Sequence, residues 1–187
     1  FETSCTLNAV TLNSNGTTDV FIAKFSSSDN LNWFRNYGTS FGDMPSGGIV
    51  ATSNGTNFFL SQLNGNGYLN KLNSVGDTLW KNVIGHPNNN NIVGRDLCFN
   101  GSTILISGTY YQTAVQIGST SLPFTSNANV FIANVDTGGV YQWGIIAECT
   151  GNSVAAFSIS NSAEDSYVCG NFGGASGAYF YFANDTL

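Results

Sequence analysis

Charge is scarce in this sequence of 187 residues. Charged residues make up 9% of it, and five Lys and Arg stand against eleven Asp and Glu. Neutralising nucleic-acid phosphates requires clustered basic side chains, so this composition excludes a nucleic-acid partner. It excludes a polybasic membrane-targeting segment for the same reason. No apolar run approaches the roughly 20 residues of a membrane span, so membrane insertion is not expected.

Histidine is also scarce, because His86 is the only one. A zinc site with two histidines cannot be built within one chain, and a Ser-His-Asp triad would need this same residue. His86 precedes Pro87 in an Asn-rich stretch that is typical of an exposed loop. The acidic residues fall mainly in expected turns, where Asp bonds to the turn backbone. We therefore expect no enzyme, no metal and no cofactor; a hydrolase would need carboxylates gathered from several hairpins.

The cysteines are few, and none has the Cys-x-x-Cys spacing of a zinc or redox motif. Cys5, Cys98, Cys149 and Cys169 allow three connectivities. We expect two disulfides in an oxidising compartment, with free thiols as the alternative. Cys149–Cys169 is the preferred bridge because a short β-connection separates the two residues, and this choice leaves Cys5–Cys98.

What the sequence does contain is an internal repeat. One segment occurs three times, and in each copy a Trp follows the leading aromatic residue by twelve positions. The pairs are Phe21 and Trp33, Tyr68 and Trp80, and Phe131 and Trp143. A fourth copy begins at Tyr181, and the sequence stops before its Trp. A repeat of this kind indicates an architecture in which similar units stack on one another.

Each copy has the pattern of a β-hairpin, with five to eight apolar or alternating residues on either side of a turn. In the first copy the strands are expected at 19–25 and 31–37. A second hairpin follows each Trp, and two of these turn through Asn54-Gly55 and Asn100-Gly101, a strong hairpin signal. Single outer strands are expected at 6–12 and 113–117.

Two hairpins per unit give four strands, which is the content of a propeller blade. The sequence therefore predicts one all-β domain over residues 1–187, a β-propeller-type repeat of four-stranded antiparallel blades. The copies start near residues 19, 66, 129 and 179. The pattern begins late in one repeat and stops early in another, so either about four blades close a ring or the chain is a segment of a longer propeller. A sandwich or β-prism is the alternative fold.

The stretch from Asp19 to Phe25, with Leu31-Asn32-Trp33 and Tyr37-Gly38, resembles the SBBP-type β-propeller repeat. Ile104 to Tyr110 and Val115 to Ala133 resemble further strands of the same repeat. The sequence departs from it at Gly67-Tyr68-Leu69-Asn70 and in the Asn-rich loop from His86 to Asn91. The resemblance implies an extracellular or surface scaffold, and it carries no common catalytic residues.

Four Asn residues have the N-glycosylation acceptor pattern: Asn15, Asn54, Asn100 and Asn184. This number is no more than the Asn, Ser and Thr content produces by chance, so position is the better evidence. Asn54 and Asn100 fall at equivalent hairpin tips, where a glycan would be exposed. The same Asn-Gly pairs would also be chosen for the turn alone.

The function predicted from the sequence is that of a non-catalytic, secreted or cell-surface glycoprotein. We expect it to act as a structural or assembly module of an extracellular structure, with self-association or other extracellular proteins as partners. Low charge suits this role because little like-charge repulsion opposes association. The alternative is a ligand-binding, lectin-like propeller with glycans as partners. The three Trp are expected between units as core residues rather than as sugar platforms.

Overall fold

The computed structural model describes residues 1–85, 91–111, 114–122, 127–149, 153–162, 165–173, 180–182 and 185–186. In this part of the chain every regular element is a strand, and no helix is long and apolar enough to cross a membrane. All paired strands are antiparallel, which confirms the expected all-β fold. The strands are β1 (Ser4–Leu7), β2 (Val10–Asn13), β3 (Val20–Phe25), β4 (Leu31–Tyr37), β5 (Asp43–Ala51), β6 (Asn57–Leu63), β7 (Asn66–Leu72), β8 (Thr78–Val83), β9 (Ile92–Phe99), β10 (Thr103–Tyr110), β11 (Val115–Ile117), β12 (Thr120–Leu122), β13 (Asn129–Asp136), β14 (Tyr141–Cys149), β15 (Ser153–Asn161), β16 (Ser166–Gly173), β17 (Phe180–Phe182) and β18 (Asp185–Thr186).

The repeated segment forms the same hairpin three times, as β3–β4, β7–β8 and β13–β14. In each hairpin the Trp pairs with the fourth residue of the repeat pattern, counted from its leading aromatic. These partners are Lys24, Lys71 and Asn134, and the pairing register shifts directly after each of them. A shared bulge at one position shows that the repeat seen in the sequence is also a repeat of backbone geometry.

The first and third copies correspond over a longer stretch. Strands β1–β4 repeat as β11–β14, with each residue replaced by the one 110 positions later, as Leu7 and Ile117 illustrate. The single strand expected at 6–12 is wrong. Asn8 and Ala9 both have positive φ, so the chain turns there and makes the tight hairpin β1–β2.

Two larger sheets form the middle of the molecule. The four-stranded sheet has the order β5-β6-β7-β8, and the six-stranded sheet has the order β18-β17-β14-β13-β10-β9. Their facing sides share the largest apolar cluster, in which Leu60 and Leu69 from the first sheet meet Ile106 and Phe131 from the second. Burial of this cluster is the main source of stability, at about 25 cal/mol for each Å² of apolar surface removed from water.

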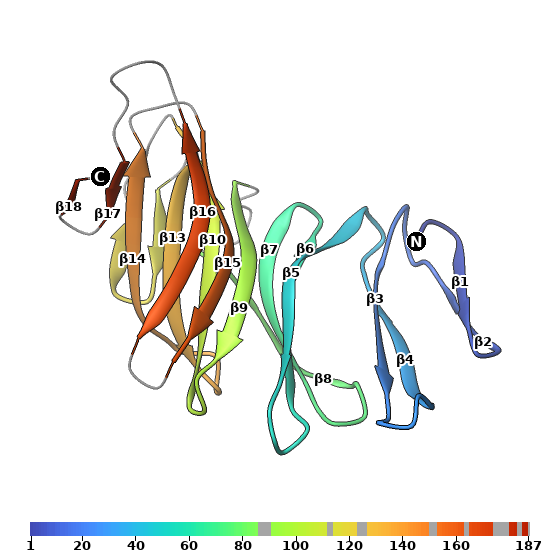
Figure 1. The fold of residues 1–187 in the computed structure, drawn as a ribbon. Coiled ribbons are helices and arrows are strands. Elements are labelled where there is room, and N and C mark those ends of the chain that lie inside the picture. The colour runs from blue at the N-terminus through green and yellow to red at the C-terminus, as the bar shows by residue number, and fades with distance from the viewer. Residues whose placement is uncertain are drawn as a thin grey trace.

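Smaller sheets cover the outer faces of these two. The hairpin β3–β4, here called the N-terminal sheet, packs Val20 and Trp33 on Phe59 and Leu72 of the four-stranded sheet. The hairpin β15–β16, here called the C-terminal hairpin, packs Ile159 against the six-stranded sheet. The layers stack in a row in the order N-terminal sheet, four-stranded sheet, six-stranded sheet and C-terminal hairpin; in Figure 1 the hairpin lies over the six-stranded sheet, with the N-terminal sheet on the far side of the four-stranded one. The described strands do not close into a ring.

The cysteines differ from the expected pairing. Cys5 and Cys98 are free, so the Cys5–Cys98 prediction is wrong. The physical reason is distance along the row, because Cys5 lies on β1 and Cys98 on β9, with the four-stranded sheet between them. Cys169 is free and exposed on β16, so the Cys149–Cys169 bridge is not formed either; the side chain of Cys149 lies outside the described part. Burial, followed by the nearby Asp96, raises the pKa of the Cys98 thiol and disfavours its thiolate.

Candidate functional site

Two of the three Trp make the same contact between successive layers, in which the ring covers a turn of the next layer. The Trp33 ring lies against Gly76 in the β7–β8 turn, and its indole nitrogen donates to the Ser74 carbonyl at 3.0 Å. The Trp80 ring lies against Gly139 in the β13–β14 turn. Both turn residues are glycines with positive φ, and the absence of a Cβ leaves room for the ring. Trp33 is therefore only 8% exposed, and Trp80 is partly buried.

Two lysines also each link one layer to a turn of the next one, through hydrogen bonds to backbone carbonyls. The Lys24 ammonium donates to the Ser74 carbonyl at 3.3 Å, and the Lys71 ammonium donates to the Thr137 carbonyl at 2.6 Å. Lys71 also lies over the Phe58 and Trp80 rings. The third repeat has no such neighbour among the described residues. Trp143 is accordingly 40% exposed, so the expectation of a buried Trp holds for two copies and is wrong for this one.

The N-terminal sheet presents an open strand edge. Among the strands with described positions, β3 pairs only with β4, and Phe1 exchanges hydrogen bonds with Asp19 just before it. Its counterpart β13 is paired on both edges, with β14 and β10. Phe21 is 50% exposed, whereas the equivalent Phe131 is fully buried. The apolar side chains of an inner strand are thus displayed at this end without a covering layer.

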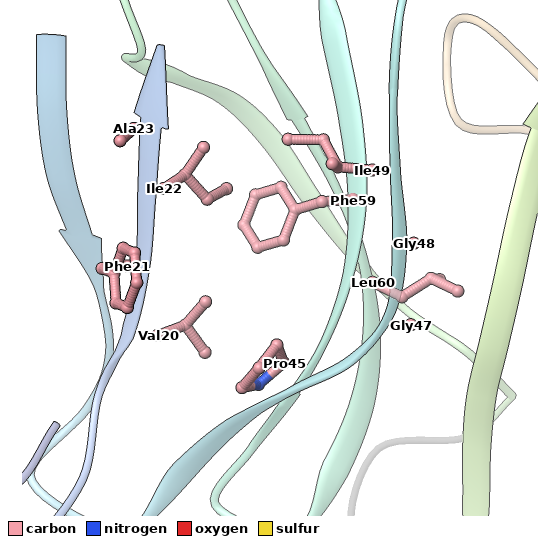
Figure 2. Close-up of a pocket in the computed structure, with 10 residues that line it drawn as sticks. All are labelled: Val20, Phe21, Ile22, Ala23, Pro45, Gly47, Gly48, Ile49, Phe59 and Leu60. Carbon is pink, nitrogen blue, oxygen red and sulfur yellow. The ribbon is translucent and has the colours of Figure 1, made fainter. Parts of the chain in front are cut away.

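A groove of about 260 Å³ runs between β3 and the strands β5 and β6. Figure 2 shows Ile22 and Phe59 pointing toward one another across it, with Ile49 and Pro45 on the β5–β6 side. Elsewhere the first strand of one layer packs on the first strand of the next layer: β5 packs on β9, and β9 packs on β15. On the groove side of β5 the described residues supply no such strand, which is why Ile49 is exposed.

The C-terminal hairpin also has a free strand edge and an exposed apolar face. Strand β16 pairs with β15 alone, and β17 pairs with β14 instead of adding to β16. The outer face of the hairpin displays Phe157 and Tyr167, both about three-fifths exposed, beside Cys169. Within the described part of the chain, this face and the free edge of β16 have no covering strand.

The glycosylation candidates lie at the surface where the structure describes them. Asn15, Asn54 and Asn100 are exposed, and Asn184 lies outside the described residues. The side-chain amide oxygen of Asn54 accepts from the backbone N–H of Thr56, and that of Asn100 accepts from the backbone N–H groups of Ser102 and Thr103. These bonds explain both residues as turn formers and leave glycosylation itself a prediction.

A second, polar pocket of about 330 Å³ lies between the tips of two hairpins. Thr52 and Asn54 line it from the β5–β6 side, Ser102 from the β9–β10 side, and Lys71 and Phe99 from below. No three His, Cys, Asp or Glu side chains gather to hold a metal ion among the residues with described positions, and His86 is not one of these.

Comparison with known proteins gives no family, since no family model and no curated protein matches the chain. The resemblance to the SBBP-type repeat therefore stays a prediction.

Tyr37 makes one of the inter-layer contacts sensitive to high pH. Its hydroxyl donates to the Gly76 carbonyl at 2.7 Å. Burial raises the pKa of Tyr37 from 10.0 to about 12, with Arg35 opposing and Asp77 adding smaller effects. Because the unfolded chain ionises first, the contribution to stability is complete below pH 10 and is lost as the pH rises toward 12.

We expect Tyr37→Phe to flatten the alkaline fall in the free energy of unfolding, measured by urea denaturation at several pH values. It should also lower stability by about 1 kcal/mol at neutral pH, where the hydrogen bond is lost. Tyr111→Phe, at an exposed position, is the control and should leave the curve unchanged. Parallel curves for wild type and Tyr37→Phe would contradict the assignment.

Proposed function

We propose that this protein is a non-catalytic structural module of an extracellular assembly, built on a β-propeller-type repeat. The observation that carries the proposal is a pair of open strand edges in the described part of the chain, one at β3 and one at β16. Each combines an open strand edge with exposed aromatic side chains. Open edges add strands from other chains unless they are shielded, and these edges carry little charge to prevent it.

We infer the extracellular location from the resemblance to a surface repeat, and the composition is compatible with it. With charged residues at 9%, the surface is kept wet by Asn, Ser and Thr, and self-association meets little electrostatic repulsion. An assembly module needs no catalytic centre.

Light scattering on the purified chain, with negative-stain images of the same sample, tests this function. We expect fibres or large oligomers whose mass is many times the 19.8 kDa of the chain. Dissociation on dilution should return a folded unit with an unchanged β-sheet spectrum. A monodisperse particle at the mass of one chain, at every concentration, would contradict the assembly role.

The polar pocket near Lys71 favours a second candidate, a lectin-like binding site. Hydroxyl and amide groups around an ammonium suit a sugar, and Phe99 offers a partly buried ring. This candidate predicts saturable binding of a mono- or disaccharide in calorimetry, abolished by Lys71→Met and retained in the exposed control Lys81→Met. Heat changes at the level of buffer dilution across a sugar panel would exclude it.

A further inference from the structure

We propose that the joint between copies is a single strand pairing, in which β3 of one chain adds to the free edge of β16 of a second chain. This inference rests on the proposed assembly function and specifies its contact. The product is a four-stranded sheet with the order β15-β16-β3-β4, in which each chain supplies two adjacent strands. The same arrangement already exists as the order β9-β10-β13-β14 inside the six-stranded sheet.

The register of the joint follows from the repeat. β16 corresponds to β10, because each pairs with a preceding strand whose bulge lies next to a pair that contains glycine: Gly108 with Gly94, and Gly170 with Ala156. β3 corresponds to β13 with a constant difference of 110 positions. The observed pair Ser107–Ile132 therefore translates into Cys169 of one chain opposite Ile22 of the other. Phe1 already occupies the place beside Asp19, so the new pairing covers Val20 to Phe25.

One side-chain fit supports this register independently. In the six-stranded sheet Phe131 lies opposite Gly108, and its ring fills the space that a side chain at Gly108 would need. The translated pair is Phe21 opposite Gly170. Phe21 is half exposed, and the nearest atoms that a side chain at Gly170 would meet belong to the backbone of Ala155 and Ala156. Phe21 of one chain and Gly170 of another would therefore form the same contact as Phe131 and Gly108.

The other exposed aromatic residues find partners in the same arrangement. The outer face of the C-terminal hairpin would fill the groove of Figure 2, bringing Tyr167 and Phe157 toward Ile49 and Phe59. The β3–β4 turn would reach Trp143, as the turns at Gly76 and Gly139 reach Trp33 and Trp80. Asp29 stands at the equivalent turn position and also has positive φ, but it carries the Cβ that Gly76 and Gly139 lack, so its turn would have to lie slightly farther from the ring.

A second copy fits this role better than the chain's own end. In Figure 1 β16 lies over the six-stranded sheet, and the four-stranded sheet stands between that sheet and β3, so the two edges do not meet within one chain. Each copy has one end of each kind, and the contact is not self-complementary. Such a heterologous contact propagates head to tail and produces fibres or rings of copies.

The test is an engineered disulfide. Residues directly opposite in an antiparallel pair have Cα atoms about 4.5 or 5.5 Å apart, within the disulfide range of about 4.4–6.8 Å. Oxidation of the assembled Ile22→Cys chain should therefore link the introduced thiol to the native Cys169 of a neighbour. We expect a ladder of dimers and larger species on non-reducing gels, with the linked peptides identified by mass spectrometry.

Lys24→Cys is the matched control, because it lies on the same strand face but two positions along, opposite Tyr167 in the proposed register. Its link to Cys169 should be at least roughly tenfold weaker, since diagonal neighbours are about 7–8 Å apart. Lys24→Cys combined with Tyr167→Cys and Cys169→Ser should restore cross-linking. This second pair tests the register without altering half-buried Ile22.

The outcomes separate the joint from the function. Large assemblies in which the Ile22→Cys thiol does not link to Cys169, or in which Lys24→Cys links more strongly, would overturn the joint and leave the assembly role standing. The linked peptide in a species of single-chain mass would also overturn it, because one chain would then close on itself. Failure of the unmodified chain to assemble at any concentration would remove both proposals.

Discussion

Replacing Trp33 with Ala is expected to lower the free energy of unfolding by about 3–5 kcal/mol. The ring is almost completely buried between the N-terminal and four-stranded sheets, and its loss also leaves the Ser74 carbonyl without the indole donor. In a chain of this length the melting temperature should fall by roughly 10 °C. Thermal unfolding followed by circular dichroism measures the change.

Trp143→Ala is the matched control, because the residue has the same place in the repeat but lies exposed at the end of the row. We expect its melting temperature, measured for the dissociated chain, to change by no more than about 2 °C, as for other exposed sites. Its assemblies should be smaller or absent in light scattering, since Trp143 belongs to the proposed joint. Equal destabilisation by the two substitutions would show that Trp143 is already covered within one chain.

The second large effect is expected at Phe131. This side chain is fully buried in the main cluster and fills the space over Gly108. Phe131→Ala should lower the free energy of unfolding by about 3–5 kcal/mol, because it removes apolar contact and opens a cavity between the two larger sheets. Urea denaturation with an unchanged m-value would show that stability has changed rather than the extent of unfolding.

Phe21→Ala replaces the equivalent residue 110 positions earlier, where half of the side chain is exposed. We expect a loss of less than about 1 kcal/mol in the dissociated chain, together with weaker assembly. An exposed aromatic outside the joint supplies the comparison: Phe41→Ala should affect neither quantity appreciably. Assembly that persists unchanged in Phe21→Ala would remove Phe21 from the contact.

Much of the local structure could be predicted from the sequence alone. Alternating apolar residues and turn chemistry act over a few positions, so the three repeated hairpins and the turns at Asn54 and Asn100 could be identified from neighbours in the chain. The hairpin β1–β2 was missed because Asn8-Ala9 is a weak turn signal. Neither residue is a glycine, so the sequence does not indicate the positive φ at this turn.

The sequence by itself determined the strands, the repeat and the scarcity of charge, since each depends on residue type and spacing. Tertiary structure alone decided which equivalent residues are buried. Phe21 and Phe131 share one pattern, yet only Phe131 has a layer on both sides of its strand. The cysteine pairing likewise depended on where β1 and β9 lie in the row. Burial and contact are set by the neighbours that stacking supplies, and spacing along the chain does not encode where a stack of similar layers is left open.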